Sequence, residues 1–313
     1  MILKYKLKSA EGEVTIHHRL LCLENNGDKK YLGGILILLT GVLSVSLVSV
    51  WVKYLRNLPL MEILFFQSLP IILIIPIILK IKKISIRGNN QFLLLIRCLL
   101  SILNNIAYYY TLTTMTLTDA VSIKQLCPFI IIVFASIFLK EKIIPKQIPV
   151  LLLALLGALL IIKPQLRVDI FPAIVGLMGA VLSAATIVIL RYLRLSDHPL
   201  VIVNYFGYAI GLTSFLVLIW QGNFRTPDLE NVLALILVAF FGLIAQITLT
   251  HAFQLVPASL ISPCLYIQII FGIIFGLVLF NEIPDLLSLI GAVIILTSGF
   301  LIYRVNNLSY VCR

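Results

Sequence analysis

The 313-residue chain is 61% hydrophobic and only 12% charged, with a mean hydropathy of +1.10. A soluble domain is closer to half apolar and a quarter charged, so lipid must be the solvent for most of this chain. The net charge of +11 does not indicate a nucleic-acid partner, because the basic residues lie in short loops between apolar runs. The five cysteines are scattered and odd in number. We therefore expect no disulfide framework, no metal site and no cofactor.

Residues 1–30 are predicted to form a polar, basic tail on the cytoplasmic side. They contain no apolar core segment of the kind that a signal peptide requires. The pair His17-His18 is a potential metal-binding feature, but no third ligand stands nearby, and a solvated tail is the simpler interpretation. A second, short cytoplasmic tail is expected at residues 306–313.

Apolar runs follow the first tail, and most have the roughly 17–25 residues that an α-helix needs to cross the hydrocarbon core. Helices are expected because period-two alternation is absent and lipid cannot satisfy the open edges of a sheet. The connections are short, so neighbouring helices should be antiparallel. The ten runs cover approximately residues 31–52, 60–79, 92–116, 119–139, 147–163, 171–192, 198–220, 230–254, 258–280 and 286–303.

The distribution of lysine and arginine between the spans predicts the orientation of the chain. With the N-terminus inside, the inner segments carry 17 basic residues and the outer loops carry 5. Both termini are therefore predicted to be cytoplasmic. The expected location is the plasma membrane, which is the inner membrane in a bacterium.

The sequence contains an internal repeat with an offset of 141 residues, at which Glu141 coincides with Glu282. The two copies cover residues 31–165 and 171–305, with five spans each. Because five is an odd number, the second copy must insert upside down relative to the first. Inverted repeats of this kind characterise secondary transporters. We therefore predict an all-α integral membrane protein with ten transmembrane helices in two inverted five-helix repeats.

Motifs in both copies carry a resemblance to a known family. They are Phe65-Phe66, Arg97, Pro128 and Glu141 in the first copy, and Gly242-Leu243-Ile244-Ala245-Gln246, Pro257-Ala258-Ser259 and Phe280-Asn281-Glu282-Ile283-Pro284-Asp285 in the second. With these motifs the chain resembles the drug/metabolite transporter superfamily of the EamA type over about residues 31–305. The resemblance implies a ten-helix carrier and no enzymatic activity.

Two phrases of the sequence are similar to one branch of that superfamily. They are Glu62-Ile63-Leu64-Phe65-Phe66 and Glu282-Ile283-Pro284-Asp285, and the branch holds bacterial S-adenosylmethionine uptake carriers and solute carrier 35 G proteins. Gln67 stands where the family usually has an arginine, so one cationic contact of the family is missing. Gln67 itself remains a candidate for substrate binding.

Arg97, Asn104 and Tyr108 share one face of the third predicted span. Polar groups inside a membrane need a reason, since a charge at the bilayer centre costs about 2.5–3.5 kcal/mol. We expect this stripe to face a substrate cavity. The alternatives are snorkelling of Arg97 to the headgroups and a helix-pairing hydrogen bond of Asn104.

Lys124 lies near the beginning of the fourth predicted span. It either snorkels to the outer headgroups or faces the cavity, where it would pair with an anionic group. Asp119, just before it, is expected to cap the start of that helix. Pro128 and Pro263 stand within apolar spans and predict kinks.

The second copy supplies Gln246, Tyr266 and Gln268 as candidates for substrate binding. Tyr266 and Gln268 are two residues apart and cannot share one narrow helical face, so we expect one of them, Tyr266, to point at the substrate. His251 lies near the predicted cytoplasmic end of its span. It is either a proton carrier or an ordinary interfacial histidine.

Glu141 and Glu282 end the fourth and ninth predicted spans, on opposite faces of the membrane. Each either sits favourably near the start of the next helix or makes a gate contact that forms in one state and breaks in the other.

The leading functional hypothesis is a carrier that moves a small polar metabolite by alternating access, with an amino acid or S-adenosylmethionine as the candidate substrate. The alternatives are a drug or metabolite exporter on the same fold and, more remotely, a membrane-embedded lipid-modifying enzyme. No Walker-type loop is present, so a proton or an exchange substrate would provide any coupling. The expected partners are thus a small-molecule substrate and the lipid bilayer, and the sequence leaves the oligomeric state open.

Overall fold

The computed structural model describes residues 14–138, 147–162, 170–194, 196–222, 227–255 and 265–311. Within these ranges the regular structure is helical throughout. The helices are α1 (Val14–Tyr54), α2 (Leu60–Ile81), α3 (Gln91–Thr114), α4 (Leu117–Lys124), α5 (Cys127–Phe138), α6 (Gln147–Ile162), α7 (Ile170–Leu193), α8 (Pro199–Gln221), α9 (Leu229–Leu255), α11 (Ile267–Phe280) and α12 (Leu286–Val311).

These helices supply the membrane spans that the apolar runs predict. In the described residues, seven stretches are long and apolar enough to cross a bilayer, and three shorter apolar helices lie in α6, α11 and α12. Large apolar side chains such as Leu73, Leu95 and Phe215 are exposed on the outside of the bundle, as lipid contact requires. The chain is therefore a multi-pass membrane protein with an all-α fold.

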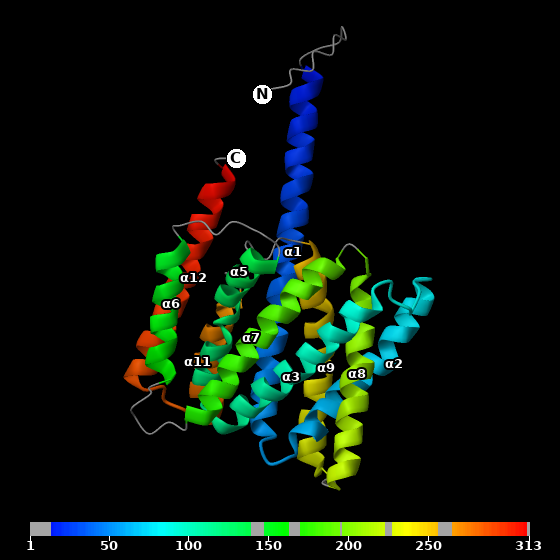
Figure 1. Ribbon diagram of the computed structural model, residues 1–313, viewed down its shortest axis with the longest axis vertical. Helices are drawn as coiled ribbons and strands as arrows, with labels where there is room; N and C mark the ends of the chain where they lie inside the picture. Colours follow the sequence, from blue (N-terminus) through cyan, green and yellow to red (C-terminus); the bar gives the residue numbers. More distant parts are fainter. Residues whose placement is uncertain are drawn as a thin grey trace.

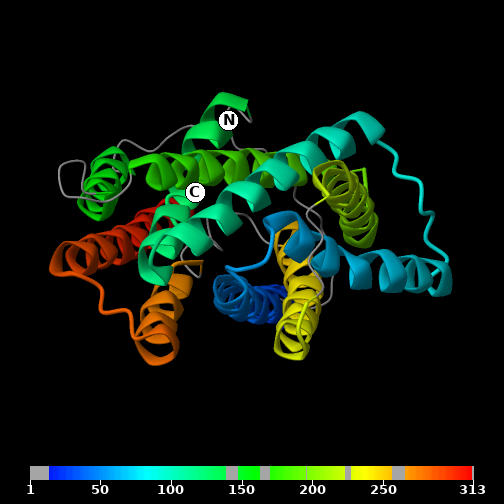
Figure 2. The same cartoon turned by 90° about the horizontal axis from the view of Figure 1, so that it is seen from below.

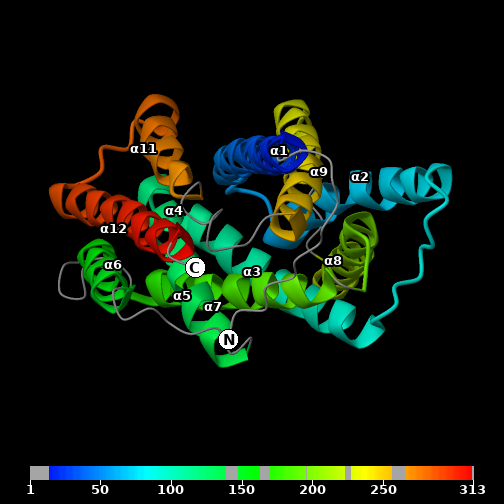
Figure 3. The same cartoon turned by 90° about the horizontal axis from the view of Figure 1, so that it is seen from above.

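The packing follows the repeat. Helix α1 packs along α9, and α3 packs along α7. In the repeat, α1 corresponds to α7 and α3 to α9, so the two pairs are equivalent. The pairs α2 with α8 and α6 with α12 each join equivalent helices of the two copies. Figure 3 shows α2 and α8 at one edge of the bundle and α6 and α12 at the opposite edge, and Figure 2 shows α3 and α7 next to each other between these edges.

Both ends of the described chain project from the same end of the bundle (Figure 1). We call this the termini end, and we call the opposite end, where α1 ends and α4 begins, the far end. Helix α1 begins at Val14, so the backbone of the predicted tail is already helical there and continues into the first span. Helix α12 likewise continues past residue 305 to Val311.

The fourth predicted span is interrupted just before Pro128, where a kink is predicted. It consists of two helices instead of one helix over residues 119–139, although Leu117–Phe134 together are long and apolar enough for one span. Helix α4 ends at Lys124, and the Leu126 backbone N–H bonds to the Ile123 carbonyl at 3.1 Å, in a tighter turn than an α-helix. The reason is Pro128, whose ring would clash with the carbonyl of residue 124 in a continuous helix. The counterpart Pro263 lies outside the described residues.

Close contact between α2 and α8 depends on small residues. A Cβ atom at Gly211 would lie 2.6 Å from Ile72 Cδ1 and 2.8 Å from Ser68 Oγ. Such distances are shorter than a van der Waals contact, so a larger residue at position 211 would have to displace these two side chains. Gly207, one turn earlier on α8, lies equally close to the Ile71 side chain.

Candidate functional site

A cavity of about 170 Å³ lies in the middle of the bundle. Its lining comes from α1, α2, α3, α7 and α9, from the end of α4 and from the starts of α5 and α11. Among the described residues it contains two cations and no carboxylate. The polar lining residues are Gln67, Arg97, Ser101, Asn104, Asn105, Tyr108, Tyr109, Lys124, Gln125, Ser183, Thr186, Gln246, Thr250 and Gln268.

The cavity lies around the middle of the bundle and reaches toward the termini end along α7 and α9. Its lining covers residues 42–48 of α1 and 97–109 of α3, near the middle of these spans, and residues 183–190 of α7 and 242–253 of α9. Helices α7 and α9 finish at the termini end, so their lining stretches lie in the halves nearest that end, whereas Gln67 lies in the half of α2 nearest the far end.

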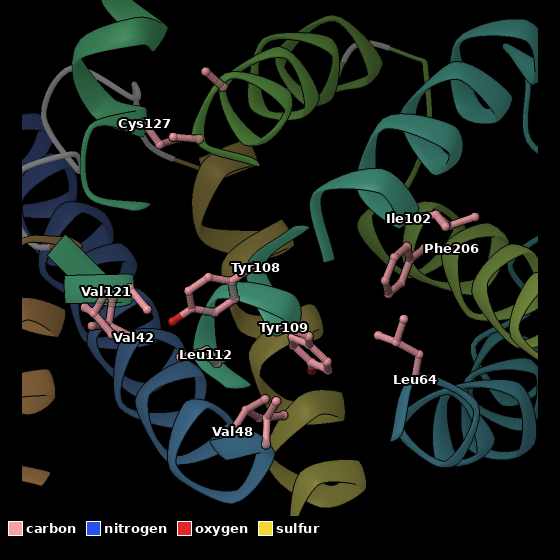
Figure 4. Packing of buried hydrophobic residues seen from close by; sticks show 14 of the residues in the cluster. Val42, Val48, Leu64, Ile102, Tyr108, Tyr109, Leu112, Val121, Cys127 and Phe206 are labelled. Atoms are coloured by element: carbon pink, nitrogen blue, oxygen red, sulfur yellow. The ribbon is translucent and has the colours of Figure 1, made fainter. Parts of the chain in front are cut away.

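Tyr108 connects the two halves of the chain at the centre of the cavity. Its hydroxyl shares a hydrogen bond of 2.7 Å with Ser49 Oγ on α1 and accepts one of 3.3 Å from Gln268 Nε2 near the start of α11. Gln268 Oε1 in turn accepts from Gln125 Nε2 at 2.8 Å, directly after α4. Figure 4 shows the Tyr108 hydroxyl directed toward α1, while Tyr109 points another way.

Arg97 is only 4% exposed, so its charge does not reach the membrane surface and the snorkelling alternative is wrong. Its guanidinium lies 5.1 Å from the centroid of the Phe206 ring, a cation–π contact, and one nitrogen donates to the Ile202 carbonyl at 3.4 Å. The buried Nε–H has no hydrogen-bond partner among the described residues. The cavity face of Arg97 therefore keeps donor capacity.

Lys124 ends α4 and also lines the cavity. Its Nζ atom lies 3.7 Å from the centroid of the Tyr108 ring, which holds the ammonium over the aromatic face. Within the described part of the chain, no carboxylate pairs with it. The position of the ammonium over the Tyr108 ring at the cavity wall is inconsistent with snorkelling to the outer headgroups.

The amides of the first copy lie where the polar stripe predicts. Gln67 Oε1 accepts a hydrogen bond of 2.7 Å from the Tyr109 hydroxyl, so this side chain is fixed at the cavity wall. Asn104 lines the cavity, and its buried Oδ1 atom has no donor among the described residues. The alternative role for Asn104, a hydrogen bond between helices, is not seen at this oxygen. Gln246 lines the same cavity from α9.

The sequence predicts that Tyr266, and not Gln268, points at the substrate, and the structure shows the reverse arrangement at the cavity. Gln268 lines the cavity, whereas the ring of Tyr266 packs with its centroid 5.7 Å from that of Phe129 and against Gly299 of α12. Tyr266 is the residue before α11, so its direction depends on where the helix begins. Tyr266 is thus buried behind the cavity and not among its described lining residues.

Asp119 does not cap α4, which corrects a second expectation. The cap is Thr116, whose hydroxyl accepts a hydrogen bond of 3.1 Å from the Asp119 backbone N–H. Asp119 stands two residues into the helix, in its first turn, where a carboxylate still interacts favourably with the helix dipole.

Glu282 lies at the far end and forms an ion pair with Lys53, the last basic residue of α1. Its other oxygen accepts a hydrogen bond of 2.9 Å from the Leu117 backbone N–H. The carboxylate therefore satisfies the N-terminus of α4. Of the two alternatives from the sequence, these contacts do not match the one in which Glu282 serves the following helix, and the gate contact stays a prediction. Glu141, the repeat counterpart, lies outside the described residues.

Sequence reasoning missed Tyr109 and Gln125 as lining residues. A single-face stripe selects Tyr108 and leaves out its neighbour, although two adjacent tyrosines on a buried helix can both border one cavity. Gln125 has a recognisable signal, namely a lone amide in an apolar span, three residues before a proline that interrupts the helix. In the described residues, no group of three His, Cys, Asp or Glu side chains could hold a metal ion.

Comparisons with known proteins agree with this architecture. The sequence model of the EamA-like transporter family matches residues 32–163 and 170–304. The chain is similar to the pseudopaline exporter of Pseudomonas aeruginosa, with 29% identity over 277 residues that cover 88% of this chain and 97% of the relative. It is 31% identical to mouse solute carrier family 35 member G1 over 280 residues, which cover 83% and 75% of the two chains.

The chain is also similar to a second named transporter and to a solved structure. The S-adenosylmethionine uptake transporter of Rickettsia prowazekii is 26% identical over 283 residues, which cover 89% of this chain and 95% of the relative. One crystal structure superposes with a TM-score of 0.64 at 15% identity, covering 86% of this chain and 96% of that chain. At this identity the structural match shows the fold alone.

Proposed function

We propose that this chain, which belongs to the EamA-like transporter family of the drug/metabolite transporter superfamily, moves a small polar organic metabolite across the plasma membrane by alternating access. The chain is a membrane transporter and not an enzyme, because its family and its named relatives are transporters. The observation that carries the proposal is the central polar cavity, which both copies of the repeat line. Midplane sites between inverted repeats are the general design of secondary carriers.

We propose that the structure represents the inward-facing state of the carrier. The cavity reaches toward the termini end along α7 and α9, while Lys53 and Glu282 hold helix ends together at the far end. With cytoplasmic termini, as the lysine and arginine distribution predicts, the far end faces outward. In the outward-facing state the contacts of Glu282 would open, and Glu141 would take the corresponding role on the inner side. This role of the two glutamates rests on the repeat.

The substrate contacts that we propose are the polar side chains that meet at the cavity. Amides and tyrosines offer donors and acceptors along the middle of the site, and the two cations favour an acidic group of the substrate. Tyr266 is proposed to support this wall by its packing. The proposed contacts are Gln67, Arg97, Asn104, Tyr108, Lys124, Gln246 and Gln268.

The direction of transport is a separate choice, since alternating access is reversible and gradients decide. A relative named as an exporter favours export, and relatives named for uptake favour import. A proton or an exchange substrate is proposed to provide the coupling, because the sequence has no Walker-type loop.

The test is flux of labelled metabolites into proteoliposomes that contain the purified chain. We expect saturable uptake that falls at least about tenfold in Asn104→Ala, because an amide at the cavity wall is lost. The matched control is Asn231→Ala, since Asn231 lies at the beginning of α9 and does not line the cavity. Absence of saturable flux for every metabolite, or equal flux in the two variants, would contradict the proposal.

A further inference from the structure

We infer that the cavity selects an organic dianion, with one carboxylate at Lys124, a second at Arg97 and an N–H group between them. This inference rests on the proposed transport function and specifies the substrate class. The first observation is charge. Two cations line the cavity, and none of the described lining residues is acidic. A ligand is the natural source of the missing negative charge, because buried charges need partners.

The Arg97 end has the donors that a carboxylate needs. A guanidinium offers five N–H donors in a planar fork. One of them is used by the Ile202 carbonyl, and the buried Nε–H has no partner among the described residues. Phe206 and Ile202 hold the guanidinium from one side, and the neighbouring Cys98 side chain takes a further hydrogen bond. The donors that are left on the cavity side are available to a ligand.

The Lys124 end offers a compact ammonium at the opposite part of the cavity. The Tyr108 ring supports it from one side, and the Tyr108 hydroxyl is already engaged by Ser49 and Gln268. Three N–H donors of the ammonium thus face an environment in which no carboxylate accepts from them, within the described residues. A ligand carboxylate would complete the site.

The separation of the two ends sets the length of the substrate. Arg97 and Tyr108 are eleven positions apart on α3, which is roughly 16 Å along the axis at 1.5 Å per residue. Allowing for the side chains and two charge-assisted hydrogen bonds, we expect carboxylates on the order of 10–15 Å apart.

Asn104 specifies what lies between the two carboxylates. It stands between Arg97 and Tyr108 on the same face, and its buried Oδ1 atom lacks a donor among the described residues. An N–H group in the middle of the substrate would satisfy it. The same charge argument disfavours S-adenosylmethionine, whose sulfonium and ammonium groups outnumber its single carboxylate.

Peptide-like dicarboxylates of increasing length test the inference. N-succinyl derivatives of glycine, diglycine and triglycine carry a carboxylate at each end and amide N–H groups between, and each added glycine lengthens them by about 3.5 Å. Binding to the full-length chain in detergent would be measured by titration calorimetry. We expect one length to bind best, and amidation of either carboxylate to weaken binding at least about tenfold.

The variants show which cation holds which carboxylate. In Lys124→Gln, the dianion should bind no better than the analogue that is amidated at the matching end. Arg97→Gln should likewise weaken binding. If that variant does not fold, Arg97→Lys replaces it: this substitution keeps the charge and should weaken binding through loss of the planar fork. Asn231→Ala is the control with unchanged binding. Equal binding of the neutral diamide, or an unchanged preference in Lys124→Gln, would overturn the inference.

The flux screen separates this inference from the proposed function. Saturable flux of a neutral or cationic metabolite, with S-adenosylmethionine among the compounds tested, would leave the carrier intact and overturn the dianion. Absence of saturable flux for every compound would overturn the carrier and the dianion together. Saturable flux confined to dicarboxylates supports both.

Discussion

The Nζ atom of Lys53 lies 2.7 Å from a carboxylate oxygen of Glu282, and this ion pair joins the end of α1 to the end of α11. Lys53 also donates to the Met115 carbonyl, and the second Glu282 oxygen accepts from the Leu117 N–H at 2.9 Å. Lys53 and Glu282 together thus connect α1, the turn between α3 and α4, the start of α4 and the end of α11. The two side chains are 7% and 24% exposed, so solvent and salt screen this pair less than a fully exposed salt bridge.

Replacement of Glu282 should shift the carrier toward the outward-facing state. Glu282→Gln keeps the shape but removes the charge, so the far end should open more often. Cys127 lines the cavity and is a native reporter in a chain whose other cysteines are replaced. We expect labelling of Cys127 by a membrane-impermeant thiol reagent from outside to rise about three- to tenfold.

The control for this experiment is Glu230→Gln. Glu230 is an exposed acid of α9 whose described contact is a hydrogen bond of 3.4 Å from the Tyr54 hydroxyl. Its replacement should leave the labelling rate unchanged. Equal rates in the wild type and in Glu282→Gln would show that the ion pair does not hold the far end closed.

Loss of the Tyr109 hydroxyl should destabilise the protein. Tyr109→Phe leaves Gln67 Oε1 buried without its 2.7 Å donor, and an unsatisfied buried acceptor costs about 1–3 kcal/mol. The thermal midpoint of the purified protein should fall by several degrees. Tyr110→Phe is the matched control, because Tyr110 contacts Phe171 through its ring. If both variants melt alike, the hydrogen bond to Gln67 contributes nothing.

A methyl group at Gly299 should conflict with Tyr266. The Cβ of Gly299→Ala would overlap the Tyr266 ring, which Phe129 holds from another side. Overpacking of this kind costs about 1–3 kcal/mol. Gly33→Ala has open space and should have no such effect. Thermal unfolding of both variants checks this, and rescue of Gly299→Ala by Tyr266→Leu is the expected confirmation.

Neutralising Lys124 should stabilise the ligand-free protein. If Lys124 had a structural role instead, its neutralisation would destabilise the protein. An uncompensated cation in the interior is costly, so Lys124→Met should raise the thermal midpoint by a few degrees while abolishing anion binding. Lys80→Met, at an exposed position near the end of α2, should change neither property. A lower midpoint for Lys124→Met would indicate that the ammonium is fully paired in the free protein.

His198 should make stability depend on pH. It lies at the start of α8, outside the span, and its Nδ1 accepts from the Leu200 N–H at 3.2 Å. Burial, together with Lys82 and His251, holds the pKa of His198 below its ordinary value of 6.5. The unfolded chain then binds the proton first, so this stabilisation is present above pH 6.5 and is lost as the pH falls from 6.5 toward the folded pKa.

The measurement is the thermal midpoint between about pH 8 and pH 5. His198→Asn keeps a capping side chain without a titrating group, so its midpoint should fall less on acidification than that of the wild type. Parallel curves for the two proteins would assign the acid sensitivity to other groups.

Composition and run length by themselves determined the membrane spans, because a bilayer requires long apolar helices whatever their neighbours are. The stripe of Arg97, Asn104 and Tyr108 was also predictable. These residues lie on one regular helix, where spacing fixes the shared face, and all three line the cavity. The family resemblance is confirmed by the match to the EamA-like transporter family.

The tertiary structure decided the features that depend on where a helix begins and what lies beside it. Gln268 and not Tyr266 lines the cavity because α11 begins at Ile267, and Thr116 caps α4 because that helix begins at Leu117. A shift of one residue turns a helical side chain by about 100°, and spacing alone does not fix the starting point. The partners of Glu282 come from α1 and α4, and only packing brings such distant segments together.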